Sequence, residues 1–210
     1  MQPIKKNYQL LLEQTIKSLA GKRPRLLLHS CCGPCSSYVM EYLAQFFDIT
    51  IFYYNPNISP ETEFRFRAAE QARLIEEMGL GVRYRLGKYD PERFFALSKG
   101  LEDLPEGGER CFRCYRLRLE ETAQLAKAEG FDFFTTTLSI SPHKNAQVLN
   151  EIGAELGAAY DVPYLFSDFK KKNGYRRSCE LSEIYRLYRQ NYCGCPFSKA
   201  EAEARERNKA

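Results

Sequence analysis

Two kinds of apolar pattern follow one another along the chain. Short segments dense in leucine, β-branched and aromatic residues, bounded by turn-forming residues, are typical of buried strands. They lie at 26–28, 48–54, 81–86, 131–138 and 162–166. Longer segments place apolar residues three or four positions apart, which is the spacing of a helix with one buried face. They lie at about 5–20, 38–47, 60–79, 91–101, 116–130, 143–158 and 174–188.

This alternation predicts an α/β fold of the Rossmann-like kind, a mostly parallel sheet with helices on both faces. The chain has 210 residues, and domains usually hold about 100 to 150. We therefore expect a single domain over residues 1–210 that includes the N-terminal helix at about 5–20. From about 198 to 210 the chain is charged and has few apolar residues, so it is predicted to be a solvated helix or a frayed tail.

Composition narrows the class of protein. Hydrophobic residues make up 44% of the chain and charged residues 28%, and no apolar stretch approaches the roughly 20 residues that span a bilayer. The N-terminal segment lacks the apolar core of a signal peptide. We therefore expect a cytoplasmic protein without membrane spans. Its net charge of +4 permits nucleic acid as a partner but does not by itself indicate one.

The eight cysteines are the most informative part of the composition. The cytoplasm keeps thiols reduced, so metal binding or redox chemistry is favoured over structural disulfides. Seven of them form three groups: Cys31, Cys32 and Cys35; Cys111 and Cys114; Cys193 and Cys195. Cys179 lies within a helical pattern and has no other cysteine at the spacing of a shared metal ligand. We therefore expect it to be a buried structural thiol.

The first group follows a predicted strand and precedes a helix, and the second group begins a helix. In an open α/β sheet, strand-to-helix turns lie at the carboxyl ends of the strands, where ligands bind. Helix N-termini stabilise anions, including thiolates. Such turns can present soft metal ligands or a reactive nucleophile, and burial of the thiols as small hydrophobic groups is the plainer alternative.

Thiolates one or two residues apart can reach one metal centre, and they select zinc, copper(I) or iron–sulfur clusters. Structural zinc needs four ligands, fewer than the seven grouped thiols, and the middle pair lies far in sequence from the other groups. An iron–sulfur cluster is therefore favoured, while a zinc site and a disulfide-exchange site stay open.

Five motifs in order carry a family resemblance. They lie at 28–35, 53–58, 111–118, 131–138 and 192–195. Together they resemble the epoxyqueuosine reductase family of the QueH type, over about residues 25–198. The resemblance implies two-electron reduction of the epoxide of epoxyqueuosine in the tRNA wobble position, giving queuosine and water in the last step of queuosine biosynthesis. It also implies a fold similar to that of PP-loop ATPases and the nucleotide-hydrolase-like group.

The same resemblance implies a [4Fe-4S] cluster beside a single coordinated iron. Four thiols are assigned to the cluster: Cys32, Cys111, Cys114 and Cys193. Three are left for the lone iron and for catalysis: Cys31, Cys35 and Cys195. A cluster supplies electrons one at a time, and a lone iron could polarise the departing oxygen. No flavin or nicotinamide fingerprint occurs in the sequence, so an external electron donor is expected, and nothing signals a cobalamin.

A tRNA substrate fits the interleaving of basic and aromatic residues, which suits phosphate contact and stacking on an unpaired base. The basic residues are Arg65, Arg67, Arg110, Arg113, Arg116, Arg118, Lys170, Lys171, Lys172, Arg176 and Arg177. The aromatic residues are Phe64, Phe66, Phe112, Tyr115, Phe169 and Tyr175. Solvated charge is the alternative for the basic residues.

Four other residues near the motifs have two possible roles each. His29 could donate to a cluster sulfur or to substrate, or it could be a hydrogen-bonded core histidine. Lys144 could touch a phosphate, although a solvated charge at a helix start is favoured. Asn55 and Asn57 could bind substrate or simply form a turn.

Two other functions stay open. A PP-loop ATPase or tRNA sulfurtransferase is expected to carry a Ser-Gly-Gly phosphate loop after its first strand. Here residues 30–34 occupy that place, with thiols instead of glycines and a proline that removes a backbone donor. A non-catalytic RNA-binding module stabilised by zinc or a cluster would need fewer cysteines than this chain has.

Overall fold

The computed structural model, which describes residues 6–208, contains a four-stranded parallel sheet. Its strands are β1 (Arg25–His29), β2 (Asp48–Tyr53), β3 (Arg83–Leu86) and β4 (Phe133–Thr136). Their order in space is β3-β2-β1-β4. The chain steps outward from β1 to β3 and then returns to the other side of β1 as β4. The strand order therefore reverses between β1 and β4, the place where α/β sheets bind ligands.

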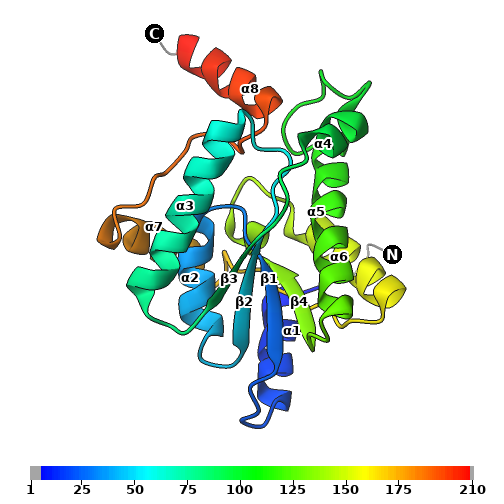
Figure 1. Cartoon of the computed structure of the whole chain (residues 1–210), viewed down its shortest axis with the longest axis vertical. Coiled ribbons are helices and arrows are strands. Elements are labelled where there is room, and N and C mark those ends of the chain that lie inside the picture. Colours follow the sequence, from blue (N-terminus) through cyan, green and yellow to red (C-terminus); the bar gives the residue numbers. More distant parts are fainter. Residues whose placement is uncertain (1–5, 209–210) are drawn as a thin grey trace.

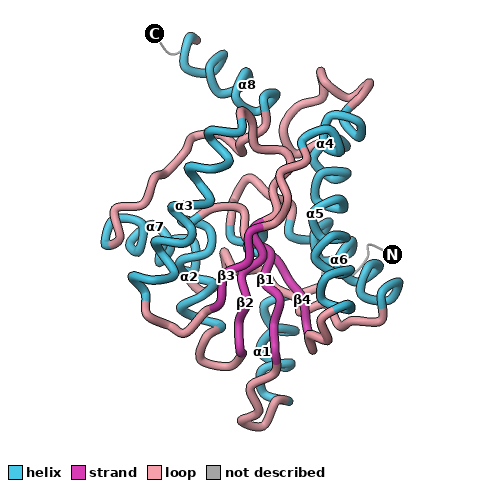
Figure 2. The backbone as a smooth tube through the Cα atoms, in the orientation of Figure 1, coloured by secondary structure: helices cyan, strands magenta, loops and turns pink. Residues whose placement is uncertain are grey.

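Helices cover both faces of this sheet, as Figures 1 and 2 show. One side carries α1 (Tyr8–Ser18), α2 (Gly33–Leu43), α3 (Glu61–Met78) and α7 (Gly174–Ile184). The other carries α4 (Pro91–Ser98), α5 (Glu109–Ala128) and α6 (Ala146–Tyr160). The last helix, α8 (Pro196–Arg207), lies beyond the carboxyl ends of the strands, in red in Figure 1. The predicted α/β, Rossmann-like fold is confirmed.

The central strand β1 explains the two halves of the core. Its side chains alternate between the faces of the sheet, so Leu26 and Leu28 pack with α2 while Leu27 packs with α5. All three are fully buried. A continuous apolar run is what a central parallel strand requires, because both of its faces are covered.

Two helices begin earlier than their apolar spacing predicts. α2 begins at Gly33, so Cys35 lies in its first turn, and α5 begins at Glu109, so Cys111 and Cys114 lie in its first two turns. Because helical backbone fixes the direction of these side chains, Cys35, Cys111 and Cys114 are held by rigid elements rather than by mobile loops.

Other elements end or begin differently from the prediction. β4 stops at Thr136 because residues Thr137–Ile140 form a 3₁₀ turn, and the predicted strand 162–166 makes only one bridge, between Phe134 and Tyr164. α6 begins at Ala146 because the side chain of Asn145 caps it. Smaller shifts affect α3, α4 and α7, and the predicted ends at residues 5 and 209–210 lie outside the described residues.

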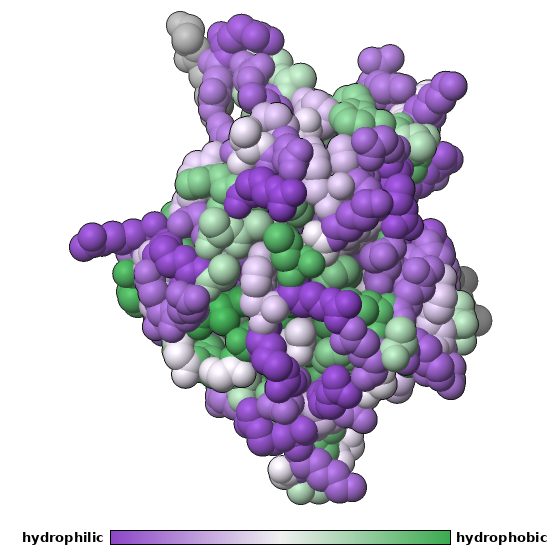
Figure 3. Space-filling view, in the orientation of Figure 1, coloured by the Kyte–Doolittle hydropathy of each residue, from purple (hydrophilic) through white to green (hydrophobic). Residues whose placement is uncertain are grey.

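The C-terminal segment forms a helix, one of the two forms expected for it, but α8 is not solvated along its whole length. Its residues Ser198 and Ala202 are buried, and Glu201 pairs with the buried Arg110 at the start of α5, with 3.4 Å between Oε1 and Nη2. On the face that Figure 3 shows, this end of the molecule is predominantly hydrophilic. Among the described residues, no helix combines the length and apolar character that crossing a bilayer requires.

The contact between α6 and Tyr164 gives a test of the packing. A Cβ at Gly153 would lie 2.5 Å from ring carbons of Tyr164, so Gly153→Ala should overpack this site and lower the free energy of unfolding by about 1–3 kcal/mol. Urea denaturation measures the change. Gly33→Ala is the matched helical control, because its nearest new contact is 3.7 Å. An unchanged midpoint for Gly153→Ala would contradict the packing.

Candidate metal centre

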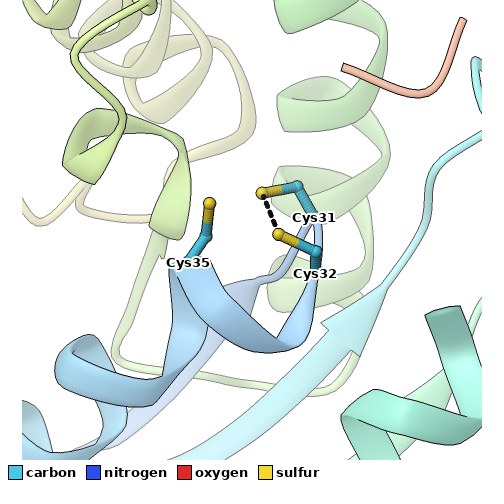
Figure 4. A group of neighbouring side chains, drawn as sticks. All are labelled: Cys31, Cys32 and Cys35. Atoms are coloured by element: carbon cyan, nitrogen blue, oxygen red, sulfur yellow. Dashed lines mark hydrogen bonds between the residues drawn. The ribbon is translucent and has the colours of Figure 1, made fainter. Parts of the chain in front are cut away.

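The first cysteine group lies where β1 passes into α2. Cys31 lies between the strand and the helix, Cys32 is the N-cap residue of α2, and Cys35 lies in the first turn of the helix. Their Sγ atoms all lie within 4.8 Å of one another, and those of Cys31 and Cys32 are 3.8 Å apart. Figure 4 shows the three side chains converging above the helix start. This spacing is suitable for three ligands of one metal ion.

Contacts among the three thiols give them different pKa values. The pKa of Cys32 lies well below its ordinary value because Cys31 and Cys35 donate hydrogen bonds to its sulfur. The contact with Cys32 raises the pKa of Cys31 to about 11, and contacts with both neighbours raise that of Cys35. Cys32 is therefore the first of the three to ionise, and a bound cation would favour ionisation of all three.

The other four thiols line a second, small cavity. Cys111 and Cys114 come from α5, while Cys193 and Cys195 come from the loop that enters α8. Burial is the main cause that raises the pKa of Cys111, Cys195 and Cys114, the last to about 12. A metal would have to supply the positive charge that four such thiolates require.

Cys193 connects the two groups. It lines the small cavity and also a large cavity of about 500 Å³ that the first group borders. We call the seven thiols of both groups the cysteine centre. Their donor set is soft and fits iron–sulfur or zinc chemistry.

The observed grouping differs from the expected division in two residues. Cys32 lies with Cys31 and Cys35, whereas Cys195 lines the small cavity with the α5 thiols. Cys179 is half-buried on α7 rather than fully buried as expected, and it lines neither cavity.

His29 is a core histidine, one of the two roles left open by the sequence. It is fully buried, with Nδ1 2.8 Å from the Thr136 hydroxyl and Nε2 3.0 Å from the Tyr54 carbonyl oxygen. Because a carbonyl only accepts, Nε2 carries the proton and Nδ1 accepts from Thr136. Burial, together with the charge of Arg118, lowers the pKa of His29 to about 3. The ring thus stays neutral and ties the end of β1 to β4 and β2.

Asn55 and Asn57 are both buried after β2. Asn55 donates from Nδ2 to the carbonyl oxygen of Ser30 at 2.8 Å, so it braces the turn that carries the first cysteine group. Asn57 lines the small cavity, and its Oδ1 has no partner within the described part of the chain. Asn55 therefore shapes the site, while Asn57 offers it a free acceptor.

The prediction that Lys144 is a solvated charge is wrong. Because α6 begins only at Ala146, Lys144 lies in the preceding loop, which directs it inward. It is 8% exposed, and its Nζ lies 2.7 Å from Oε1 of Glu106. Both residues line the large cavity beside the first cysteine group. The pair therefore places a buried cation at the wall of that cavity.

The basic residues predicted to contact RNA divide into two sets. Arg67, Arg110 and Arg118 are at most 2% exposed, so the prediction is wrong for them; they lie on the inward faces of α3 and α5. Phe64, Tyr115 and Phe169 are buried as well and cannot stack on a base. Most of the exposed members pair with acidic side chains. Helical periodicity alone does not separate the two sets, because lysine and arginine have an apolar stem as well as a charged head and so occur on either face of a helix.

The sequence pattern does not indicate three of the residues that line the large cavity. Glu106, Arg189 and Arg205 line the large cavity together with Tyr192. Glu106 and Arg189 lie in loops without a recognisable pattern. Arg205 lies on α8, for which the only signal is the spacing of its small buried residues, four apart.

Comparison with known proteins gives consistent results. Residues 26–201 match the family described as "Epoxyqueuosine reductase QueH". A protein of that name from Staphylococcus epidermidis is 44% identical over 200 residues, which cover 91% of this chain and 84% of the relative. Relatives of the same name from Streptococcus pyogenes and Thermotoga maritima are 44% and 38% identical, over 91% and 84% of this chain and 78% and 91% of their own lengths.

His29 should make folding stability depend on pH. Its pKa is about 3 in the folded protein and 6.5 ordinarily, so between these values the unfolded chain binds a proton that the folded chain does not. The contribution of neutral His29 to the free energy of unfolding is complete above about pH 6.5. It is lost as the pH falls toward 3, by up to about 1.4 kcal/mol per pH unit. Urea denaturation of metal-free protein at pH 7 and pH 5 measures this loss.

His29→Gln should lose less free energy of unfolding between pH 7 and pH 5 than the wild type does, since glutamine does not titrate. The exposed His143 provides the matched control, and His143→Gln should retain the full loss. Equal losses in His29→Gln and the wild type would show that His29 is not held neutral in the folded protein.

Proposed function

The chain belongs to the epoxyqueuosine reductase QueH family, and we propose that it reduces the epoxide of epoxyqueuosine in tRNA with metal held by its cysteine centre. The observation that supports this most is the convergence of seven thiols, from three distant segments, on two cavities that share Cys193. A structural zinc site would use four of them. The remaining thiols border a cavity large enough for a substrate.

The proposed cofactors are a [4Fe-4S] cluster and an adjacent iron. The grouping of the thiols favours the cluster on the four cysteines of the small cavity and the iron on the three after β1. These are Cys111, Cys114, Cys193 and Cys195 for the cluster, and Cys31, Cys32 and Cys35 for the iron. Three protein ligands leave a coordination position open, as catalytic metal sites require. When bound, the metals would supply single electrons and a Lewis acid.

The large cavity is the proposed substrate site. Its volume of about 500 Å³ falls within the range of small-ligand pockets. Tyr175 and Tyr192 offer aromatic faces at its wall, and Arg189 and Arg205 are exposed there with no acidic partner within residues 6–208. This combination suits an unstacked nucleotide from an anticodon loop and its flanking phosphates.

The reaction breaks both carbon–oxygen bonds of the epoxide and forms a carbon–carbon double bond. Two electrons from an external one-electron donor and two protons from solvent convert the oxygen to water. Burial by itself lowers the pKa of Lys144, but Cys193, Tyr115 and Glu106 outweigh it, so the pKa is raised. A lysine that stays protonated is suited to donating a hydrogen bond to the negative charge that develops on the departing oxygen.

The rival functions have less support. Three converging thiols stand where a PP-loop ATPase would bind phosphate. A non-catalytic module gives no reason for a cavity bordered by thiols and a buried Lys–Glu pair. Because the proposed substrate is tRNA, we also propose that the protein acts in the cytoplasm.

The cofactors are tested by metal analysis of anaerobically purified protein. Wild type should contain iron and sulfide and absorb broadly in the visible. Cys111→Ala or Cys114→Ala should abolish the absorption because each removes a cluster ligand. Cys35→Ala should lower the iron content by about one per chain and spare the sulfide, since it removes a ligand of the lone iron.

Cys179→Ala is the matched control and should change neither metal nor sulfide content. Colourless wild-type protein that holds zinc and no sulfide after reconstitution would contradict the cluster. Loss of all sulfide in Cys35→Ala would contradict the division of the thiols.

Lys144→Met should slow epoxide reduction about 100- to 1,000-fold, the usual effect of removing a donor to a developing oxyanion. The rate is measured in a single turnover by analysing nucleosides from the tRNA, after confirming full iron and sulfide content. Lys144→Met combined with Glu106→Gln controls for the carboxylate left unpaired, and it should be as slow. A wild-type rate in the double variant would exclude Lys144 from the reaction.

A further inference from the structure

Arg118 is a buried cation without an acidic partner. It lies on α5 with 1% of its surface exposed, and no carboxylate within residues 6–208 pairs with it. The other two buried arginines are paired, Arg67 with Glu63 at 2.7 Å and Arg110 with Glu201 at 3.4 Å. Burying an uncompensated charge is strongly unfavourable, so the anion that balances Arg118 must be of another kind.

The hydrogen bonds of Arg118 do not balance its charge. Nε donates to the carbonyl oxygen of Cys114 at 3.3 Å, and Nη1 donates to Oδ1 of Asn55 at 3.4 Å. Both acceptors are neutral, and both distances are longer than is usual for an N–H···O hydrogen bond. The third nitrogen, Nη2, is buried and has no partner within the described residues. A donor is therefore free at the small cavity, which Arg118 lines with four thiols.

The groups near Arg118 that can carry a negative charge when they ionise or bind metal are mainly thiols. Burial by itself lowers the pKa of its guanidinium, but the charges of Cys114, Cys193 and Cys31 outweigh burial, so the pKa is raised. These three residues come from the three cysteine groups that are far apart in sequence. Arg118 thus lies where the groups meet.

We propose that Arg118 is the counter-cation of the cysteine centre, with Nη2 donating to a sulfur atom in the small cavity. The inference rests on the proposed function, because it concerns the metal that the thiols hold. A fixed positive charge stabilises a centre more strongly after it has gained an electron, so it raises the reduction potential. Arg118 acts on the reaction through the metal, and it is a positioning residue rather than a catalytic one.

A purely structural role would leave the reduction potential unchanged. In that role Arg118 would only tie α5 to the segment after β2 through Asn55. The potential of the loaded protein therefore separates the two roles, which folding stability and activity do not.

The experiment measures the midpoint potential of loaded protein by spectroelectrochemistry, beside its iron and sulfide content. Arg118→Gln should load and shift the potential to more negative values, by at least a tenfold loss in the equilibrium constant for one-electron reduction, or about 59 mV. Arg118→Lys keeps the charge and should stay near wild type. Arg110→Gln combined with Glu201→Gln is the matched control, because it removes an equally buried arginine of the same helix and cavity together with its carboxylate partner, and so leaves the net charge unchanged.

An Arg118→Gln variant that is fully loaded at the wild-type potential would overturn the proposal, and so would a shift no larger than that of the double variant of Arg110 and Glu201. If Arg118→Gln does not load, loading of Arg118→Lys near the wild-type potential supports the role of charge. If neither Arg118 variant loads while the double variant of Arg110 and Glu201 does, metal loading requires the shape of the guanidinium rather than its charge, and the proposal is overturned. Wild-type protein without iron and sulfide would instead overturn the proposed cofactors, and this inference with them.

Discussion

The cysteine centre depends on buried hydrogen bonds that hold the carboxyl ends of three strands together. His29 contacts Thr136 and the Tyr54 carbonyl, and so connects the ends of β1, β4 and β2. Asn55 then braces the turn after β1 by donating to Ser30. These groups have no access to water, so leaving any of them unpaired would cost the full desolvation penalty. The turn that carries Cys31 and Cys32 is therefore fixed by contacts outside it.

A second set of contacts brings the last cysteine pair to this turn. The Ser59 backbone N–H donates to the Gly194 carbonyl oxygen at 3.0 Å, and Nη1 of Arg67 donates to the Cys193 carbonyl oxygen at 3.3 Å. Gly194 has φ +117, and a Cβ there would lie 2.9 Å from Ile58 and 3.1 Å from Arg67. Only glycine suits this conformation and this close approach. The Cys-Gly-Cys spacing thus follows from packing as well as from ligand geometry.

Buried positive charge surrounds the cysteine centre. Arg67, Arg110, Arg118 and Lys144 are each less than a tenth exposed, and several of the thiols are buried too. Ionised thiols in such surroundings need either metal or protein cations to balance them. The protein supplies part of this balance itself, and only Arg118 among the four lacks a carboxylate partner within the described residues. This arrangement connects the fold of α3 and α5 to the electronic properties proposed for the metal.

The sequence by itself determined the alternation of strands and helices, the three cysteine groups and the family resemblance, because these depend on local periodicity and on motifs that are contiguous in the chain. It could not show that Arg67, Arg110 and Arg118 are buried, since a basic residue on a helix has the same local pattern whether it meets solvent or a thiol. Nor could it place Lys144 and Glu106 together, 38 residues apart. Only the tertiary structure decided which thiols lie together and what charge surrounds them, because both depend on contacts between segments whose distance in sequence carries no information about their distance in space.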